Sequence, residues 1–154
     1  MGFFARLERI ERETFALHPG EFWCEVFTGE HLSIDYAGGR PVLCVTGHRS
    51  GDDLMHWSRW ERVDRDVMPP TFIQDLFARY PVVNCEFIGG RLIEVHLRGN
   101  PDFAHGNSEA VPVWEGQPTE RQGWTFIPDP VDDEETYNFA WEAHRPYRTG
   151  ILVR

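Results

Sequence analysis

Residues 84–100 have the sequence NCEFIGGRLIEVHLRGN, in which Gly89-Gly90 separates two short runs rich in apolar residues. Two such runs joined by Gly-Gly are a strong signal for a β-hairpin, because glycine adopts the positive φ angles of a tight turn without strain. The sequence therefore predicts an antiparallel pair formed by Val82–Ile88 and Arg91–Leu97. Acidic and basic residues interrupt both apolar runs, so this hairpin is also the best candidate for a functional site.

One face of the second predicted strand carries Glu94, His96 and Arg98, because every second residue of a strand points the same way. Simple pairing about the turn sets Glu86 opposite Ile93, whereas a bulge or a one-residue shift would bring Glu86 to the face of Glu94. Two neighbouring carboxylates either share a proton or hold a cation, and Mg²⁺ takes oxygen ligands together with substrate phosphate. Arg98 could bind that phosphate. The alternative is a solvated strand face with a weak Glu–Arg pair.

The pattern along the whole chain predicts an α+β fold, with a mainly antiparallel sheet and helices packed on one face. Apolar residues at helical spacing predict helices, and short runs bounded by glycine or proline predict strands. Helices are expected at 3–17, 71–80 and 134–144, and further strands at 21–27, 32–36, 41–46, 124–127 and 149–153. Residues 99–122 are expected to be mostly loop, and residues 54–63 are ambiguous. The length of 154 residues indicates one domain, residues 1–154.

The charge balance restricts the possible partners. All 15 basic residues are Arg, and 25 acidic residues give a formal net charge of −10. Such a surface repels nucleic-acid phosphates and anionic membranes, so neither is expected as a partner. The lack of lysine excludes catalysis by a Lys amine. No apolar run reaches the roughly 18 residues that a membrane span needs. Three cysteines without CxxC spacing, and a start that lacks a signal peptide, indicate a cytoplasmic protein.

The order of Glu86, Gly89-Gly90, Glu94, His96 and Arg98 resembles the terminal metal-binding hairpin of the ATP-grasp fold family. In that family an acidic residue on one strand is followed, across a short turn, by Glu-x-Asn-x-Arg or a close variant. The resemblance implies that Glu86 and Glu94 hold Mg²⁺ and that Arg98 stabilises the transferred phosphate. His96 stands where the family usually has Asn. Imidazole is a poorer ligand for Mg²⁺ than an oxygen, so His96 could contact phosphate instead.

A second stretch, residues 22–35, resembles the adenine hinge of the same family. The resemblance implies that Glu25 and Val26 face the adenine of ATP and that Glu30 or His31 contacts the ribose. It covers residues from about 20 to 103. The upstream lobe of the family, with its glycine-rich loop and phosphate-binding lysines, has no counterpart in this sequence. Three explanations stay open: a partner chain or a homo-oligomer completes the site, the domain has lost catalysis, or the sequence is part of a longer protein.

The resemblance implies an ATP- and Mg²⁺-binding domain that belongs to, or derives from, an ATP-dependent carboxylate–amine or carboxylate–thiol ligase. Its substrate would be a small-molecule carboxylate, activated as an acyl phosphate. Two alternatives stay open. The chain could be a non-catalytic binding or assembly domain that keeps the fold and uses its aromatic residues at a partner or homodimer interface. It could also be an unrelated α+β domain whose hairpin merely carries charges.

Overall fold

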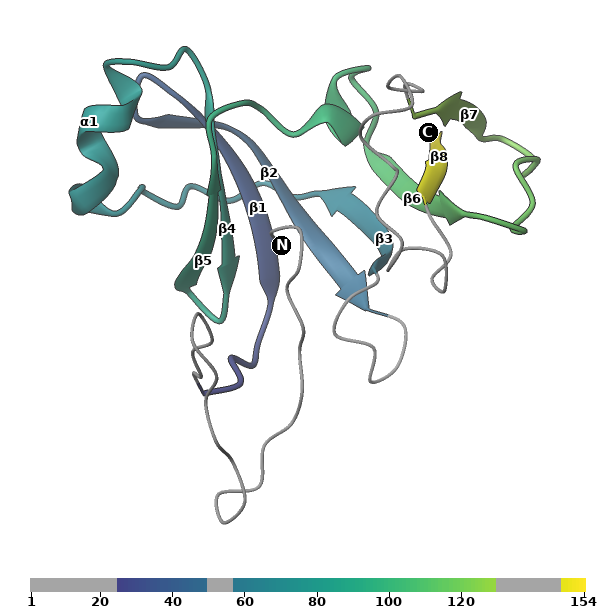
Figure 1. The fold of residues 1–154 in the computed structure, drawn as a ribbon, viewed down its shortest axis with the longest axis horizontal. Helices are drawn as coiled ribbons and strands as arrows, with labels where there is room; N and C mark the ends of the chain where they lie inside the picture. The colour runs from purple at the N-terminus through teal and green to yellow at the C-terminus, as the bar shows by residue number, and fades with distance from the viewer. Residues whose placement is uncertain (1–24, 50–56, 130–147) are drawn as a thin grey trace, which may run out of the picture.

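The computed structural model describes residues 25–49, 57–129 and 148–154. In these residues eight strands form one antiparallel sheet with the order β5-β4-β1-β2-β3-β6-β8-β7 (Figure 1). The strands are β1 (His31–Ala37), β2 (Arg40–Arg49), β3 (Trp57–Arg62), β4 (Val83–Ile88), β5 (Arg91–His96), β6 (Glu109–Trp114), β7 (Thr125–Pro128) and β8 (Arg148–Val153). The hairpin β4–β5 lies at one end of the sheet, and β6, β8 and β7 lie at the other.

The predicted α+β class is wrong for the described residues, which form a mostly-β structure without a layer of helices on one face. The helix predicted over 71–80 is reduced to a 3₁₀ turn, Thr71–Ile73, that continues into α1 (Gln74–Phe77). Pro81 sets the limit of the segment, because the residue before a proline avoids the α conformation, and the 3₁₀ turn and the single α turn already place Ile73, Leu76 and Phe77 on the first core. The same finding contradicts the lobe fold that the ATP-grasp resemblance implies.

Several other predicted elements can be compared with the structure. The hairpins β1–β2 and β4–β5 and the strands β7 and β8 confirm the predicted strands. The ambiguous residues 54–63 include β3. The predicted helices at 3–17 and 134–144, and most of the predicted strand at 21–27, lie outside the described residues. The part of the chain that the structure describes contains no helix long and apolar enough to cross a membrane.

Strand β6 was predicted as loop, and its proline explains the error. Pro112 cannot donate a hydrogen bond, so a proline inside an apolar run argues against a central strand. In the structure β3 pairs only with Glu109 and Ala110 of β6, whereas β8 pairs with β6 over its length. Pro112 therefore lies where one side of β6 has no partner strand among the described residues, and it costs no bond of their ladder.

Apolar side chains pack on one face of β1, against residues 63–80. The buried residues of this first core are Leu32, Ile34, Tyr36, Cys44, Ile73, Val83, Cys85 and Phe87. The other face of β1 carries His31, Ser33 and Asp35, which are buried as well. Alternation of apolar and polar residues, as at 32–36, is typical of a half-buried strand, but β1 lies between β2 and β4 within the sheet and both of its faces are buried.

A second core lies towards the other end of the sheet. Its buried residues are Val45, Trp60, Phe103, Ala110, Ile151 and Val153. Val45 is paired with Ser33 of β1, and paired residues point to the same side of a sheet. The second core therefore continues the face of β1 that carries the polar residues. A row of buried polar groups thus borders an apolar core on one surface of the sheet.

We expect the two described cysteines to be chemically inert in the folded protein. Burial raises the pKa of Cys44 and of Cys85 from 9.0 to about 11, with Glu30 and Asp35 adding to the respective effects. At pH 8 this change lowers the thiolate fraction about a hundredfold. In a Cys24→Ser variant, Ellman's reagent should therefore react only as fast as the protein unfolds, and it should label both thiols at once in urea. Rapid labelling of the native variant would contradict the burial of these residues.

Candidate functional site

A β-bulge in the hairpin β4–β5 resolves the register that the sequence left open. Ile88 pairs with Arg91 and Phe87 pairs with Leu92, but the ladder then shifts so that Glu86 pairs with Glu94. The extra residue of β5 in this shift is Ile93, whose side chain is exposed. A bulge places two residues of one strand opposite one of the other and re-aims the side chains that follow. It therefore brings both glutamates to one face of the sheet.

Two adjacent rungs of three residues form this face across β1, β4 and β5. The members of each rung pair with one another, and the two rungs are two residues apart on every strand, so all six side chains point the same way. The first rung consists of Ser33, Glu86 and Glu94, and the second consists of Asp35, Asn84 and His96. Ser33 is small, and its size leaves room above it for the carboxylate of Glu86.

Glu86, Glu94 and His96 form a compact set of metal-ligating groups. One ligand atom from each lies within 4.8 Å of the other two. His96 Nε2 is 3.7 Å from Glu86 Oε1 and 3.7 Å from Glu94 Oε1. Between a fifth and a third of each side chain is exposed, so an ion could enter from solvent.

A hydrogen bond joins the carboxylate of Glu86 to His31. His31 Nε2 lies 3.0 Å from Glu86 Oε2, and the His31 side chain is only 3% exposed. Burial by itself would raise the pKa of Glu86, but the hydrogen bond from His31 and the adjacent His31 and His96 imidazoles lower this pKa below its ordinary value. The carboxylate is therefore ionised at neutral pH, as a metal ligand must be.

A buried polar network supports the same face beside the cluster. The Asn84 side-chain amide donates to Ser33 Oγ and to Asp35 Oδ1, each at 2.8 Å. The backbone N–H of Asn100 also donates to Asp35, at 3.0 Å. These bonds tie the central strand β1 to β4 and to the loop after β5, and they satisfy groups that would be costly to bury alone. Sequence reasoning did not assign a role to Ser33, Asp35 or Asn84.

The other residues predicted to hold ATP lie away from the cluster. Glu25 forms an ion pair with Arg91, and Val26 is 59% exposed. Glu30 forms an ion pair with Arg65 at 3.2 Å. Of the four residues predicted to contact adenine or ribose, the structure thus brings only His31 to the metal-ligating groups, where it contacts Glu86.

Arg98 follows β5 and points elsewhere than the cluster. Its guanidinium is exposed and donates to the carbonyl of Gly99 at 3.1 Å. Its backbone carbonyl accepts a hydrogen bond from the Asn84 N–H, at 3.0 Å, so the main chain here stays attached to β4. Among the contacts of the described residues, none joins the Arg98 guanidinium to Glu86 or Glu94.

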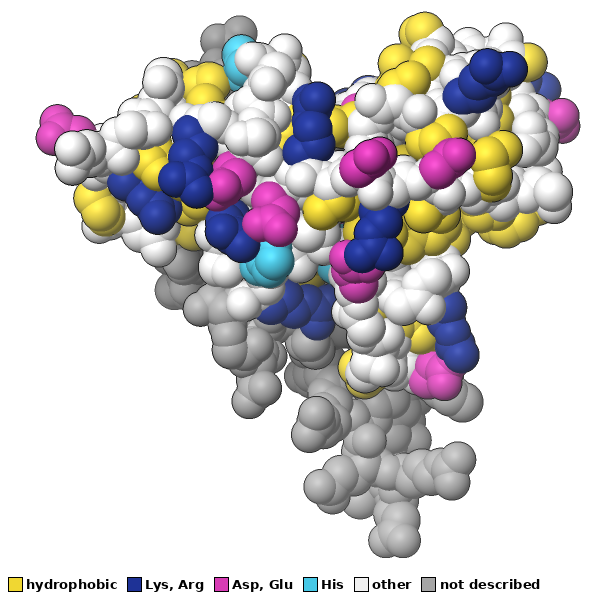
Figure 2. All heavy atoms as spheres, turned by 180° about the vertical axis from the view of Figure 1, so that it is seen from behind, with side chains coloured by type: hydrophobic (Ala, Val, Ile, Leu, Met, Phe, Trp, Pro, Cys, Tyr) yellow, Lys and Arg dark blue, Asp and Glu magenta, His cyan; other side chains and the backbone are white. Residues whose placement is uncertain are grey.

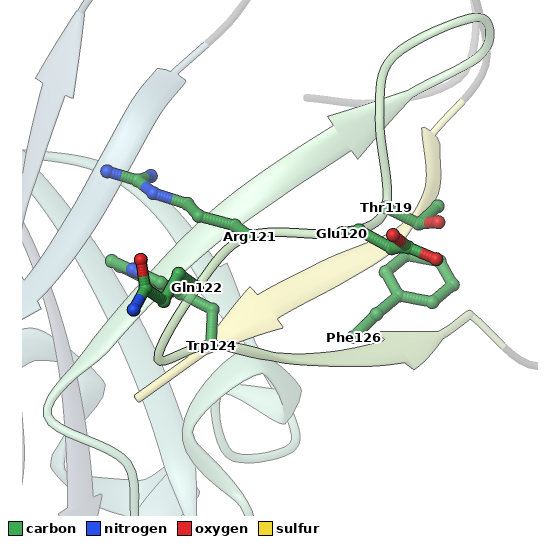
Figure 3. A pocket seen from close by; sticks show the side chains of 6 residues that line it. All are labelled: Thr119, Glu120, Arg121, Gln122, Trp124 and Phe126. Atoms are coloured by element: carbon green, nitrogen blue, oxygen red, sulfur yellow. The ribbon is translucent and has the colours of Figure 1, made fainter.

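An open pocket of about 600 Å³ lies elsewhere, lined by the loop that joins β6 to β7 and by β7 itself (Figure 3). Thr119, Glu120 and Phe126 lie to one side of the picture, and Arg121, Gln122 and Trp124 lie to the other. Arg121 stacks on Trp124 with its guanidinium carbon 4.4 Å from the ring centre. The lining offers one carboxylate and no imidazole. We therefore regard the hairpin cluster, not this pocket, as the place with reactive chemistry.

Several of the other charged side chains of the described residues form ion pairs. Figure 2 shows acidic and Arg side chains interspersed over the face opposite to the view of Figure 1. Ion pairs account for part of this pattern, since Arg59 contacts Glu61 at 2.7 Å and Arg154 contacts Glu109 at 2.6 Å. Exposed pairs of this kind contribute little free energy and indicate no particular ligand.

Comparison with known proteins adds no relative to this description. No protein-family model, no curated protein and no solved structure matches the chain.

Proposed function

We propose that this chain binds a divalent metal ion through Glu86, Glu94 and His96, and with the ion the phosphate groups of a nucleotide such as ATP. The observation that carries the proposal is the bulge, which places Glu86 opposite Glu94 and next to His96. Two like charges that face each other across a strand pair repel each other and attract a cation. A cation bound between the two carboxylates would reduce this repulsion.

The spacing of the three groups suits an ion after small side-chain rotations. Oxygen ligands of Mg²⁺ lie about 2.1 Å from the metal, so neighbouring ligand atoms in an octahedron are about 3 Å apart. The ligand atoms here are within 4.8 Å of one another without an ion, and a cation would draw them together. An imidazole beside two carboxylates also suits Mn²⁺, which accepts nitrogen more readily than Mg²⁺ does.

Three protein ligands leave about half of an octahedral shell for other groups. Mg²⁺ and related ions commonly fill such positions with water and substrate phosphate. The nucleotide part of the proposal rests on these remaining coordination positions and on the short motif that resembles the ATP-grasp hairpin. A ligase activity on a small-molecule carboxylate stays a prediction, because no described contact identifies such a substrate.

Calorimetric titration tests the proposal directly. The wild-type chain is titrated with Mn²⁺ and with Mg²⁺, each alone and in the presence of ATP, and the Glu94→Gln variant is titrated in parallel. Loss of a direct ligand should weaken Mn²⁺ binding by more than the roughly 10- to 100-fold that loss of an outer-shell partner costs. The matched control is Glu115→Gln, which neutralises an exposed carboxylate in the turn after β6 and should leave the Kd unchanged.

The outcomes separate the two parts of the proposal. If the wild type binds no Mn²⁺ at millimolar concentration, the metal site is refuted. If Mn²⁺ binds and Glu94→Gln abolishes it, but ATP binds neither with nor without the ion, the metal site stands and the nucleotide does not. Equal loss of binding in Glu94→Gln and Glu115→Gln would indicate a general charge effect in place of a defined site.

A further inference from the structure

His31 is a buried histidine that the three-ligand site does not use. Its ring is 3% exposed and lies edge-on against two tryptophans, with centroids 4.7 Å from Trp57 and 5.1 Å from Trp60. On β2 the residue paired with His31 is Gly47. A Cβ at Gly47 would lie 2.8 Å from the Trp60 ring, so the absence of a side chain there creates the space in which the aromatic rings surround His31.

The two ring nitrogens of His31 differ in their hydrogen bonding. Nε2 lies 3.0 Å from Glu86 Oε2, whereas Nδ1 is buried and has no hydrogen-bond partner. A buried N–H without an acceptor costs about 1–3 kcal/mol. Of the two possible tautomers, the arrangement therefore favours the one that carries its proton on Nε2, where it donates to Glu86.

We propose that His31 is a positioning residue of the metal site: its Nε2–H holds one oxygen of Glu86 and thereby directs the other oxygen at the ion. This inference rests on the proposed metal-binding function and deepens it. Oε2 is engaged by His31, and Oε1 is the atom that lies 3.7 Å from His96. The two tryptophans fix the imidazole plane, so the Glu86 carboxylate loses less rotational freedom when an ion binds.

Outer-shell donors of this kind have a measurable effect in metalloproteins. A ligating carboxylate is usually hydrogen-bonded in turn, and loss of that partner typically weakens metal binding 10- to 100-fold. His31 comes from a part of the sequence far from the hairpin, and the pairing of β1 with β4 brings it beneath Glu86. The site is therefore built from the central strand as well as from the hairpin.

The tautomer can be measured without any metal ion. Long-range ¹H–¹⁵N correlation spectra of the metal-free wild type at pH 7.5 should show a proton on Nε2 of His31. His48, whose Nε2 lies 3.4 Å from an Arg59 nitrogen and whose side chain is 41% exposed, serves as an internal comparison. A proton on Nδ1 alone would overturn the proposal whatever the metal affinity.

The affinity is tested with two substitutions at the same position. His31→Phe keeps a flat ring between the tryptophans and removes the donor, and we expect its Kd for Mn²⁺ to rise about 10- to 100-fold. His31→Gln supplies an amide donor to Glu86 and should recover at least half of that loss on a logarithmic scale. His48→Gln is the matched control and should bind Mn²⁺ as the wild type does. Urea unfolding of each variant gives its stability separately.

The results distinguish this proposal from the proposed function. If the wild type binds Mn²⁺ and folded His31→Phe binds it equally well, the positioning role is refuted and the metal site stands. If both variants lose stability alike and their Kd values do not differ, His31 serves packing only, and the proposal is also refuted. If His31→Phe does not fold, the position of the proton on His31 and the Kd of His31→Gln decide instead. The proposal then requires the proton on Nε2 and a Kd of His31→Gln for Mn²⁺ less than tenfold above that of the wild type.

Discussion

Replacement of Arg148 by methionine should lower the free energy of unfolding by about 2–4 kcal/mol. Its guanidinium lies between two aspartates and donates to both oxygens of each, to Asp102 at 2.9 and 2.6 Å and to Asp129 at 2.9 and 3.0 Å. Removal of one partner from a buried ion pair costs about 3–5 kcal/mol, and partial exposure of Arg148 reduces that figure. Methionine keeps the aliphatic stem, so the loss reports mainly on the charge and its hydrogen bonds.

The position of Arg148 explains why its replacement should destabilise more than one part of the structure. Asp102 belongs to the 3₁₀ turn η2 (Pro101–Phe103), which follows the hairpin of the metal site and contributes Phe103 to the second core. Arg148 is the first residue of β8, at the opposite end of the sheet. The ion pairs therefore fasten the loop beyond the hairpin to the far strands, and their loss should weaken both.

Arg154→Met provides the matched control for Arg148→Met. Arg154 follows the same strand and donates to Glu109 at 2.6 Å, but half of its side chain is exposed. Exposed ion pairs contribute about 0–1 kcal/mol, so this variant should unfold at nearly the urea concentration of the wild type. Equal midpoint shifts for the two variants would show that the burial of the Arg148 pairs is not what stabilises them.

The hairpins were predictable because their signal is local. Gly38-Gly39 and Gly89-Gly90 take positive φ angles, and the apolar runs on either side identify the strands without any knowledge of the rest of the chain. The bulge was not predictable, because it depends on how β4 pairs with β1 on one side and with β5 on the other. The sequence permitted both registers, and only the face that β1 presents selects between them.

The sequence indicated which residues form the candidate site, but it did not indicate which residues hold them in place. Glu94 and His96 were recognised from their spacing, because a strand repeat of two residues places them on a common face, whereas Glu86 joins that face only through the bulge. Glu30 or His31 was expected to contact the ribose, but the observed partner of His31 is Glu86, a residue 55 positions away. No local pattern indicates such a pair. The alternation of apolar and polar residues in β1 was the available signal, and such alternation is typical of a strand with one solvated face.

The helix predicted over 71–80 shows the opposite error, in which a local pattern was trusted too far. The apolar residues of 71–80 have helical spacing, and most of them do pack on the first core. Phe72 is the exception, since 77% of its side chain is exposed. A 3₁₀ turn followed by one turn of α-helix is sufficient to set Ile73, Leu76 and Phe77 against the sheet. Pro81 then prevents the helix from continuing past Tyr80.

Substitution of Gly89 by alanine should destabilise the protein by about 2–5 kcal/mol, which is more than the same change costs at its neighbour Gly90. Gly89 has a φ of 57° and Gly90 a φ of 79°. Alanine at positive φ costs about 1–2 kcal/mol at either position. A Cβ at Gly89 would in addition collide with the backbone carbonyl oxygen of Thr28, whereas a Cβ at Gly90 meets nothing within 4 Å. An overpacked contact of this kind adds about 1–3 kcal/mol.

The contact at Gly89 matters because it joins the hairpin turn to the segment that leads into His31. The Gly89 N–H donates to the carbonyl of Glu30 at 3.0 Å, and a Cβ at Gly29 would lie only 2.9 Å from the Gly89 Cα. An alanine that pushes the two backbones apart should therefore move His31 relative to Glu86. Urea unfolding of Gly89→Ala and Gly90→Ala measures the stability difference, and Mn²⁺ titration of both should show weaker binding in Gly89→Ala alone. Identical unfolding curves would show that the turn yields without strain and that its close contact with residues 28–30 does not fix the site.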